Sequence, residues 1–170
     1  MNNDYFDLLQ IEKGFSINLE ILEGNYLHLQ TKYHPDQADD SVQRVKFLNI
    51  SANLNAAYKT LANDFARAQY LLLLNGLSLE DVKSIGAYSA FLQQILEETL
   101  EKNEFLQNID DQAQLLAFLE SQKCSREELL TKMHRAFIDA NMQNFLLYTY
   151  QMKYLDKIVS AAQQKLFRYC

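Results

Sequence analysis

The stretch Lys32-Tyr33-His34-Pro35-Asp36 decides how the first half of the chain folds, because it holds the single proline of the sequence. Proline has no backbone N–H and disfavours a helical conformation in the residue before it, so a helix that reaches this stretch ends at Tyr33 or His34. The proline also stiffens the turn, which holds the side chains of His34 and Asp36 outward on a rigid support. By itself, the tripeptide fits either an ordinary helix–helix turn or a small docking point.

Amphipathic helices are predicted on both sides of this turn. Before it, Asn18 is a suitable N-cap, and apolar side chains then recur at helical spacing. After it, a polar loop over residues 34–41 leads to a helix capped by Asp40 or Ser41. The expected stripes consist of Leu19, Leu22, Tyr26, Leu29 and Tyr33 before the turn, and of Leu48, Ser51, Leu54, Asn55, Tyr58 and Leu61 after it.

The surroundings of His34-Pro35-Asp36 resemble a J-domain. The run Asp4-Tyr5-Phe6-Asp7-Leu8-Leu9 begins a short predicted helix over residues 4–12, and a fourth helical segment follows Asn63-Asp64. J-domains are four-helix modules whose H-P-D loop engages a DnaK-type chaperone and stimulates its ATP hydrolysis, and the resemblance implies the same activity here. The chaperone-binding residues that we expect are His34, Pro35, Asp36, Lys32 and Arg44.

Two departures from the J-domain pattern concern charge. Glu20 and Glu23 lie on the helix that is often basic in J-domains, and Gln37 stands where a lysine often follows the H-P-D tripeptide. Charge governs the rate of encounter more than the final affinity. We therefore expect weaker electrostatic steering, or a chaperone whose docking surface is less acidic.

The second half of the chain predicts an antiparallel three-helix bundle. Apolar periodicity and short polar turns predict helices over residues 88–106, 111–138 and 141–168. The middle helix could instead break where Ser125-Arg126-Glu127-Glu128 matches a capping box, although we favour one continuous helix. The expected fold class is all-α: an N-terminal J-domain, made of an antiparallel helix pair and two short helices, joined to this bundle. The expected boundaries are residues 1–75 for the J-domain, 76–86 for a linker and 87–170 for the bundle.

The helix over residues 88–106 carries more apolar surface than a core contact requires. Its apolar side chains, from Phe91 and Ile95 round to Leu100, cover an arc of about 180°. A core-facing stripe needs little more than about 100°. The surplus predicts an exposed patch for a partner, and the alternative is that the leucines are core and the neighbouring glutamates form a solvated face.

Three further stretches are similar to the HscB family of J-type co-chaperones, which act in iron–sulfur cluster assembly. They are Ser51-Ala52-Asn53-Leu54-Asn55-Ala56-Ala57-Tyr58-Lys59-Thr60-Leu61, Arg67-Ala68-Gln69-Tyr70-Leu71-Leu72 and Tyr154-Leu155-Asp156-Lys157-Ile158. In that family the J-domain contacts a DnaK-like chaperone, HscA, and the bundle binds the scaffold protein IscU. The resemblance implies the same two partners here. It also implies these scaffold-binding residues: Leu92, Leu96, Glu97, Leu100, Glu104 and Tyr154.

Gln93 and Leu100 depart from the residues that are common in this family, which leaves the exact binding footprint open. Two other interpretations of the chain are retained. It could serve a general DnaK-type chaperone and carry another client, or it could be a purely structural helical module. The second interpretation predicts that the H-P-D loop tolerates substitution.

Composition limits the remaining possibilities. A net charge of −6, spread over both halves of the chain, disfavours nucleic acid as a partner. The longest apolar run, residues 70–74, is too short to cross a membrane. Cys124 and Cys170 form no metal-binding or disulfide pattern, and no phosphate loop or nucleophile motif occurs. We therefore expect a cytoplasmic, monomeric protein that is not an enzyme and holds no cofactor or metal.

Overall fold

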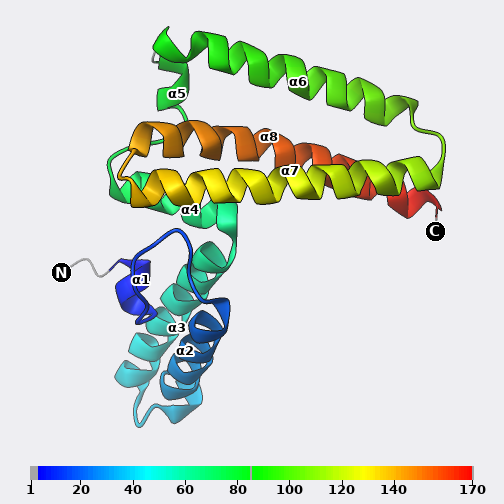
Figure 1. Cartoon of the computed structure of the whole chain (residues 1–170). Helices are drawn as coiled ribbons and strands as arrows, with labels where there is room; N and C mark the ends of the chain where they lie inside the picture. Colours follow the sequence, from blue (N-terminus) through cyan, green and yellow to red (C-terminus); the bar gives the residue numbers. More distant parts are fainter. Residues whose placement is uncertain (1–3, 85, 170) are drawn as a thin grey trace. The chain divides into compact units, whose positions relative to one another are not determined.

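The structure is a computed structural model that describes residues 4–84 and 86–169, and every regular element in these residues is a helix (Figure 1). The prediction of an all-α fold is confirmed. The chain divides into two compact units, of which the first ends at Leu71 and the second begins at Leu72. The predicted boundary, after residue 75, lies at the end of α4 (Asp64–Leu74), whereas the observed division falls inside this helix.

The first unit is built on an antiparallel helix pair. Helices α2 (Leu19–Lys32) and α3 (Ser41–Ala62) lie side by side, with α1 (Tyr5–Leu8) packed against α3 (Figure 1). The turn between α2 and α3 contains a short 3₁₀ helix, η1 (Pro35–Gln37). The predicted helix pair and its connecting turn are thus present.

Local capping explains where these helices begin. The side-chain oxygens of Asp4, Asn18 and Asp40 accept hydrogen bonds from the first free N–H groups of α1, α2 and α3. Helix α1 is shorter than the predicted helix over residues 4–12. It ends because Gln10 has a φ of 55°, a left-handed conformation that cannot continue an α-helix.

The core of the first unit contains Leu22, Leu29 and Leu54 from the two predicted stripes. Leu61 of the second stripe is buried as well, but two other leucines of the stripes are not: Leu19 is 50% exposed and Leu48 is 51% exposed. These two leucines lie on the predicted stripes but are not part of the core. Spacing identifies one face of a helix, but it does not show how far along that face the neighbouring helix covers it.

Polar side chains also join α2 to α3. Gln30 donates from its Nε2 to the carbonyl of Ser51 at 3.1 Å and to Asn55 Oδ1 at 2.7 Å. The Ser51 hydroxyl donates back to Gln30 Oε1 at 2.7 Å, and the Tyr26 hydroxyl donates to Asn55 Oδ1 at 2.7 Å. The two helices are thus linked by directional bonds as well as by apolar packing.

The second unit is a bundle of three long helices. Helices α7 (Gln112–Ile138) and α8 (Met142–Leu166) pack along their length, and α6 (Ser89–Asn108) packs on α8 (Figure 1). Short elements precede and follow them: α5 (Asp81–Ser84), η2 (Gly86–Tyr88) and η3 (Phe167–Tyr169). A buried cluster joins the three long helices and comprises Leu106, Ile109, Leu115, Phe118, Ile158 and Ala162.

Helix α7 is continuous, as predicted, and does not break at Ser125. The Ser125 hydroxyl donates instead to the carbonyl of Ser121 at 3.1 Å, a bond made within an ongoing helix. The segment that was expected to be a linker, residues 76–86, includes α5, and its Leu79 and Val82 are buried. Helix α5 contacts α8, so this segment belongs to the packed second unit.

Candidate functional site

The H-P-D tripeptide forms a capped turn at the end of α2. His34 is the N-cap of η1, and its Nδ1 accepts a hydrogen bond from the backbone N–H of Asp36 at 3.2 Å. The carbonyl of His34 accepts from the N–H of Gln37 at 2.9 Å. The side chains of His34 and Asp36 are nevertheless 55% and 73% exposed. The turn is therefore fixed from within, while its polar groups stay accessible.

This cap determines which atoms of His34 face a partner. Because Nδ1 accepts a hydrogen bond, the neutral ring carries its proton on Nε2, which is left to act as a donor. The Asp36 carboxylate supplies an acceptor two residues further on, with its Oδ2 3.5 Å from Nδ1. The turn thus presents one donor and one acceptor with little freedom to rearrange.

The other two predicted chaperone-binding residues lie on the helices beside the turn. Lys32 ends α2 and holds its Nζ 5.3 Å from the centre of the Tyr33 ring. That ring packs edge-on against Phe47 of α3 at 5.5 Å, which ties the end of α2 to α3. Arg44 is exposed in the first part of α3. The structure therefore gathers all five predicted residues around one turn of the first unit.

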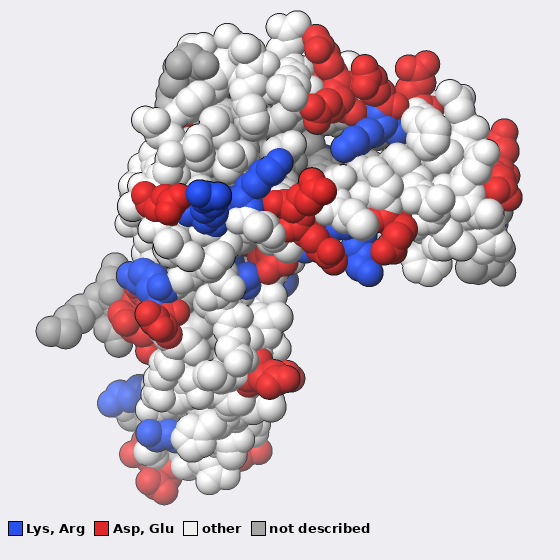
Figure 2. Space-filling model, in the orientation of Figure 1, with Lys and Arg blue, Asp and Glu red and all other residues white. Residues whose placement is uncertain are grey.

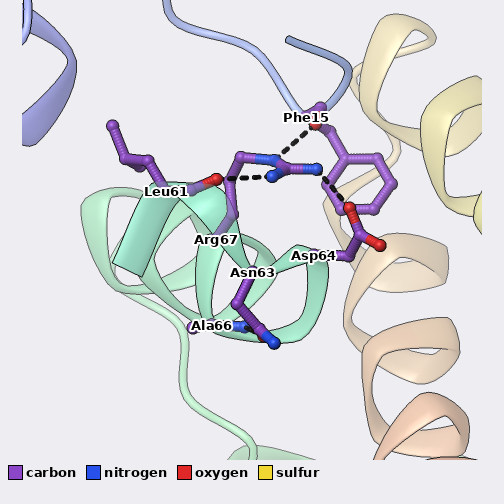
Figure 3. A network of polar contacts seen from close by, with 6 residues as sticks. All are labelled: Phe15, Leu61, Asn63, Asp64, Ala66 and Arg67. Atoms are coloured by element: carbon purple, nitrogen blue, oxygen red, sulfur yellow. Dashed lines mark hydrogen bonds and ion pairs between the residues drawn. The ribbon is translucent and has the colours of Figure 1, made fainter. Parts of the chain in front are cut away.

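A buried arginine stabilises this unit away from the turn (Figure 3). Arg67 is 4% exposed and donates to the carbonyl of Phe15 at 2.7 Å, to the carbonyl of Leu61 at 2.5 Å and to Asp64 Oδ1 at 2.6 Å. Its guanidinium also lies over the Phe15 ring at 5.4 Å. From the sequence, Arg67 was noted only as part of a stretch similar to the HscB family, and no structural role was predicted for it. The signal for a buried role was a charged residue on the apolar side of a predicted helix.

The start of α1 is held by a second polar contact. Asp4 pairs with Lys13 at 2.5 Å and accepts from the N–H groups of Phe6 and Asp7. Burial acts to raise the pKa of Asp4, but Lys13 and the two backbone N–H groups outweigh it and hold this pKa below its usual value. The hydroxyl of Tyr70 accepts from the N–H of Tyr5 at 2.9 Å, and the two rings stack. These contacts fix α1 within the first unit.

The predicted scaffold-binding residues of α6 lie along one flank of that helix. Leu96 is 47% exposed, Leu100 is 68% exposed and Leu92 is half-buried, whereas Ile95 faces the core with 3% exposure. The alternative that these leucines are all core is therefore wrong for Leu96 and Leu100. Glu97 and Glu104 are exposed on the adjoining surface, and Figure 2 shows acidic side chains gathered over α6.

Tyr154, the remaining predicted residue, lies on α8 and is half-buried. It lines a polar cavity of about 190 Å³ together with Ile95 and Glu98 of α6. Its hydroxyl lies 3.0 Å from that of Tyr150. Burial, followed by this hydrogen bond, raises the pKa of Tyr150 to about 12, so Tyr150 stays protonated at neutral pH. The structure thus places Tyr154 across this cavity from the core-facing Ile95 of α6, on a different helix from the exposed leucines.

No group of three or more His, Cys, Asp or Glu residues is placed to hold a metal within residues 4–84 and 86–169. In the same residues, no helix is both long and apolar enough to cross a membrane. Cys124 is exposed and pairs with no other cysteine in the described part of the chain.

An H-P-D turn at the end of an antiparallel helix pair, combined with a separate helical bundle, defines a J-domain protein with a C-terminal helical domain. Comparison with known proteins gives a narrower assignment. Residues 92–163 match the domain family described as the HSCB C-terminal oligomerisation domain. The co-chaperone protein HscB homolog of Shewanella frigidimarina is 30% identical over 154 residues, which cover 89% of this chain and 88% of that protein. The corresponding protein of Neisseria meningitidis is 28% identical over 166 residues, which cover 92% of this chain and 95% of that protein.

Solved structures agree with these relatives. Human co-chaperone protein HscB superposes with a TM-score of 0.85 at 25% identity, covering 96% of this chain and 82% of that one. Chaperone HscB from Vibrio cholerae also gives a TM-score of 0.85, covering 98% of this chain and 100% of that one. Because the two sequences are only 23% identical, this likeness supports the fold alone. The chain belongs to the HscB family of co-chaperones.

Proposed function

We propose that this protein stimulates the ATPase of a DnaK-type, HscA-like chaperone and delivers an IscU-type iron–sulfur scaffold protein to it. The capped and exposed H-P-D turn is the observation that carries the proposal. Its donor at His34 Nε2 and its acceptor at Asp36 would dock on the chaperone, with Pro35, Lys32 and Arg44 around them. Membership of a co-chaperone family supports this assignment.

The bundle would hold the client. Leu92, Leu96 and Leu100 provide the apolar part of the binding surface, and Glu97 and Glu104 provide its acidic border. Tyr154 would contribute from α8. Because one chain carries both sites, the client is tethered near the chaperone, and its effective concentration there rises.

The chaperone site is tested by measuring ATP turnover of the purified HscA-like chaperone with the wild-type protein and with His34→Gln. We expect stimulation by the wild type and its loss in the variant, since the capping imidazole and its outward N–H are both removed. His28→Gln is the matched control, because His28 is an exposed histidine on α2. Equal stimulation by all three proteins would mean that the loop is only a turn.

The client site is tested by calorimetry with the IscU-type scaffold protein. Leu96→Ala with Leu100→Ala should weaken binding by at least about tenfold, since apolar anchors in an interface often cost more than 1 kcal/mol each when truncated. Leu116→Ala with Ile138→Ala removes two leucine-sized side chains of similar exposure from α7 and should leave affinity unchanged. Unchanged affinity in the α6 variant would remove this surface from the proposal.

Two further expectations belong to the proposal. We expect the protein to act in the cytoplasm, and cell fractionation tests this location. We also expect a monomer, although the matching C-terminal domain family is named for oligomerisation. Light scattering after size-exclusion chromatography, at several protein concentrations, decides between the two states.

A further inference from the structure

One flank of α8 carries a stripe that alternates tyrosine and lysine. Tyr150, Lys153, Tyr154 and Lys157 follow at spacings of three, one and three residues, so they are neighbours on a single helical face. We call these four residues the α8 stripe. Tyr154 belongs to the proposed client site, and the other three residues have no role in it so far.

Each lysine of the α8 stripe lies over a tyrosine ring. The Nζ of Lys153 is 6.0 Å from the centre of the Tyr150 ring, and the Nζ of Lys157 is 5.5 Å from the centre of the Tyr154 ring. The two rings are 5.2 Å apart, and their hydroxyls are joined at 3.0 Å. Cation–π contacts of this kind restrict where the ammonium groups can move. The stripe therefore holds two positive charges in a defined arrangement before any partner arrives.

These charges remain available for a partner. Among the described residues, neither Lys153 nor Lys157 forms an ion pair, whereas the nearby Asp156 is engaged by Arg126 at 3.2 Å. A ring face leaves the N–H groups of an ammonium free to donate to carboxylate oxygens. Two lysines on a chain of net charge −6 are too few to hold a nucleic acid backbone, so carboxylates of a protein are the better fit.

The sign of the charge also differs between the two helices that form the client site. On α6, Glu97, Glu101 and Glu104 are exposed, whereas the α8 stripe is basic. A client that contacts both helices must present basic groups toward one and acidic groups toward the other. Such a pattern fixes the orientation of the client as well as its identity.

We infer that the accessible part of the α8 stripe, Lys153, Tyr154 and Lys157, is the second half of the client-binding surface and that it binds a carboxylate-bearing segment of the same scaffold protein that docks on α6. Tyr150 is only 3% exposed and supports Lys153 from within the bundle. This inference rests on the proposed function, because it assumes that the scaffold protein binds the bundle. Tyr154 joins the two halves, since it lies in the stripe and also lines the cavity shared with Ile95 of α6.

Calorimetry with the purified IscU-type scaffold protein and the full-length chain tests the inference. Lys153→Glu with Lys157→Glu should weaken binding by about fivefold or more and reduce its dependence on salt, because attraction becomes repulsion. Lys153→Gln with Lys157→Gln should give a smaller loss in the same direction. Lys123→Glu with Arg135→Glu changes the net charge equally at exposed positions of α7 and should change affinity less than twofold.

The outcomes separate the inference from the proposed function. If the Lys153 and Lys157 variants bind like the α7 control while Leu96→Ala with Leu100→Ala weakens binding, the stripe is not part of the surface and the proposed function stands. If the scaffold protein does not bind the wild-type chain, both fail together. Circular dichroism of each variant ensures that any loss reflects the surface and not unfolding of α8.

Discussion

Replacing Arg67 with methionine removes three charged hydrogen bonds from the interior of the first unit. The carbonyls of Phe15 and Leu61 and the carboxylate of Asp64 each lose the donor that they share (Figure 3). Hydrogen bonds to charged groups stabilise by about 1.5–3 kcal/mol each. Bonds within one network are not additive, and removing one partner of a buried ion pair costs about 3–5 kcal/mol. We expect a loss of about 3–5 kcal/mol.

That loss is large for a unit of this size. At about 0.05–0.15 kcal/mol per residue, a unit of roughly 70 residues is stable by roughly 4–10 kcal/mol. Hydrogen exchange measured residue by residue should therefore show much faster exchange in α2 and α3 of Arg67→Met. The core amides of α7 and α8 should exchange as in the wild type, because their contacts are unchanged.

Two controls make the test specific. Arg67→Lys keeps the charge but cannot reach three acceptors with one planar group, so it should be destabilised less than Arg67→Met. Arg44→Ala removes an exposed arginine from the same unit and should change stability by less than about 0.5 kcal/mol. A loss below about 1 kcal/mol for Arg67→Met would refute the reasoning that this network stabilises the unit.

Four other substitutions test three separate features. Because the pKa of Asp4 is lowered in the folded chain, its carboxylate contributes fully to stability above the unfolded pKa of 3.8, and this contribution is lost as the pH falls through the folded pKa. Asp4→Asn should therefore lower the melting temperature at neutral pH and have no such effect in acid. Gly76→Ala should lower the free energy of unfolding in urea by about 1 kcal/mol, because Gly76 has a φ of 72° after the end of α4. Gly24→Ala, inside α2, should raise it by about 0.5–1 kcal/mol. Equal effects of the two substitutions would contradict this argument. Gln122→Leu should raise stability by about 1 kcal/mol, since Gln122 is 4% exposed and its Oε1 is buried without a partner in the described structure; a lower melting temperature would show that this polar group is needed.

Local features of the fold could be predicted from the sequence, and long-range ones could not. The caps at Asn18 and Asp40 and the stop before Pro35 depend on neighbouring residues, so the start and end of α2 and the start of α3 were predicted correctly. The bond from Arg67 to the carbonyl of Phe15 could not be predicted, because Phe15 lies 52 residues away in the chain. Whether a helix neighbour covers a given leucine is likewise a tertiary property.

The candidate site shows the same limit. The sequence indicated the H-P-D turn and an apolar surplus on α6, and the structure places these residues on exposed surfaces. The sequence did not show that His34 caps its own turn, since the choice between Nδ1 and Nε2 as the capping atom depends on backbone geometry. It also did not show the cation–π pairs on α8, because tyrosines and lysines at helical spacing occur on many solvated faces.

The polar bonds between α2 and α3 fix the register of the two helices and with it the position of the H-P-D turn along the helix pair. Apolar helix faces can slide along one another by small steps, but Gln30, Ser51 and Asn55 can form their hydrogen bonds in one register only. The next repeating register is a full helical turn away, about 5.4 Å along the axis. A slip of that size would carry the turn out of reach of any surface shaped to fit it. The helix pair therefore allows the turn one position and no intermediate ones, and a chaperone would bind the turn only in that position.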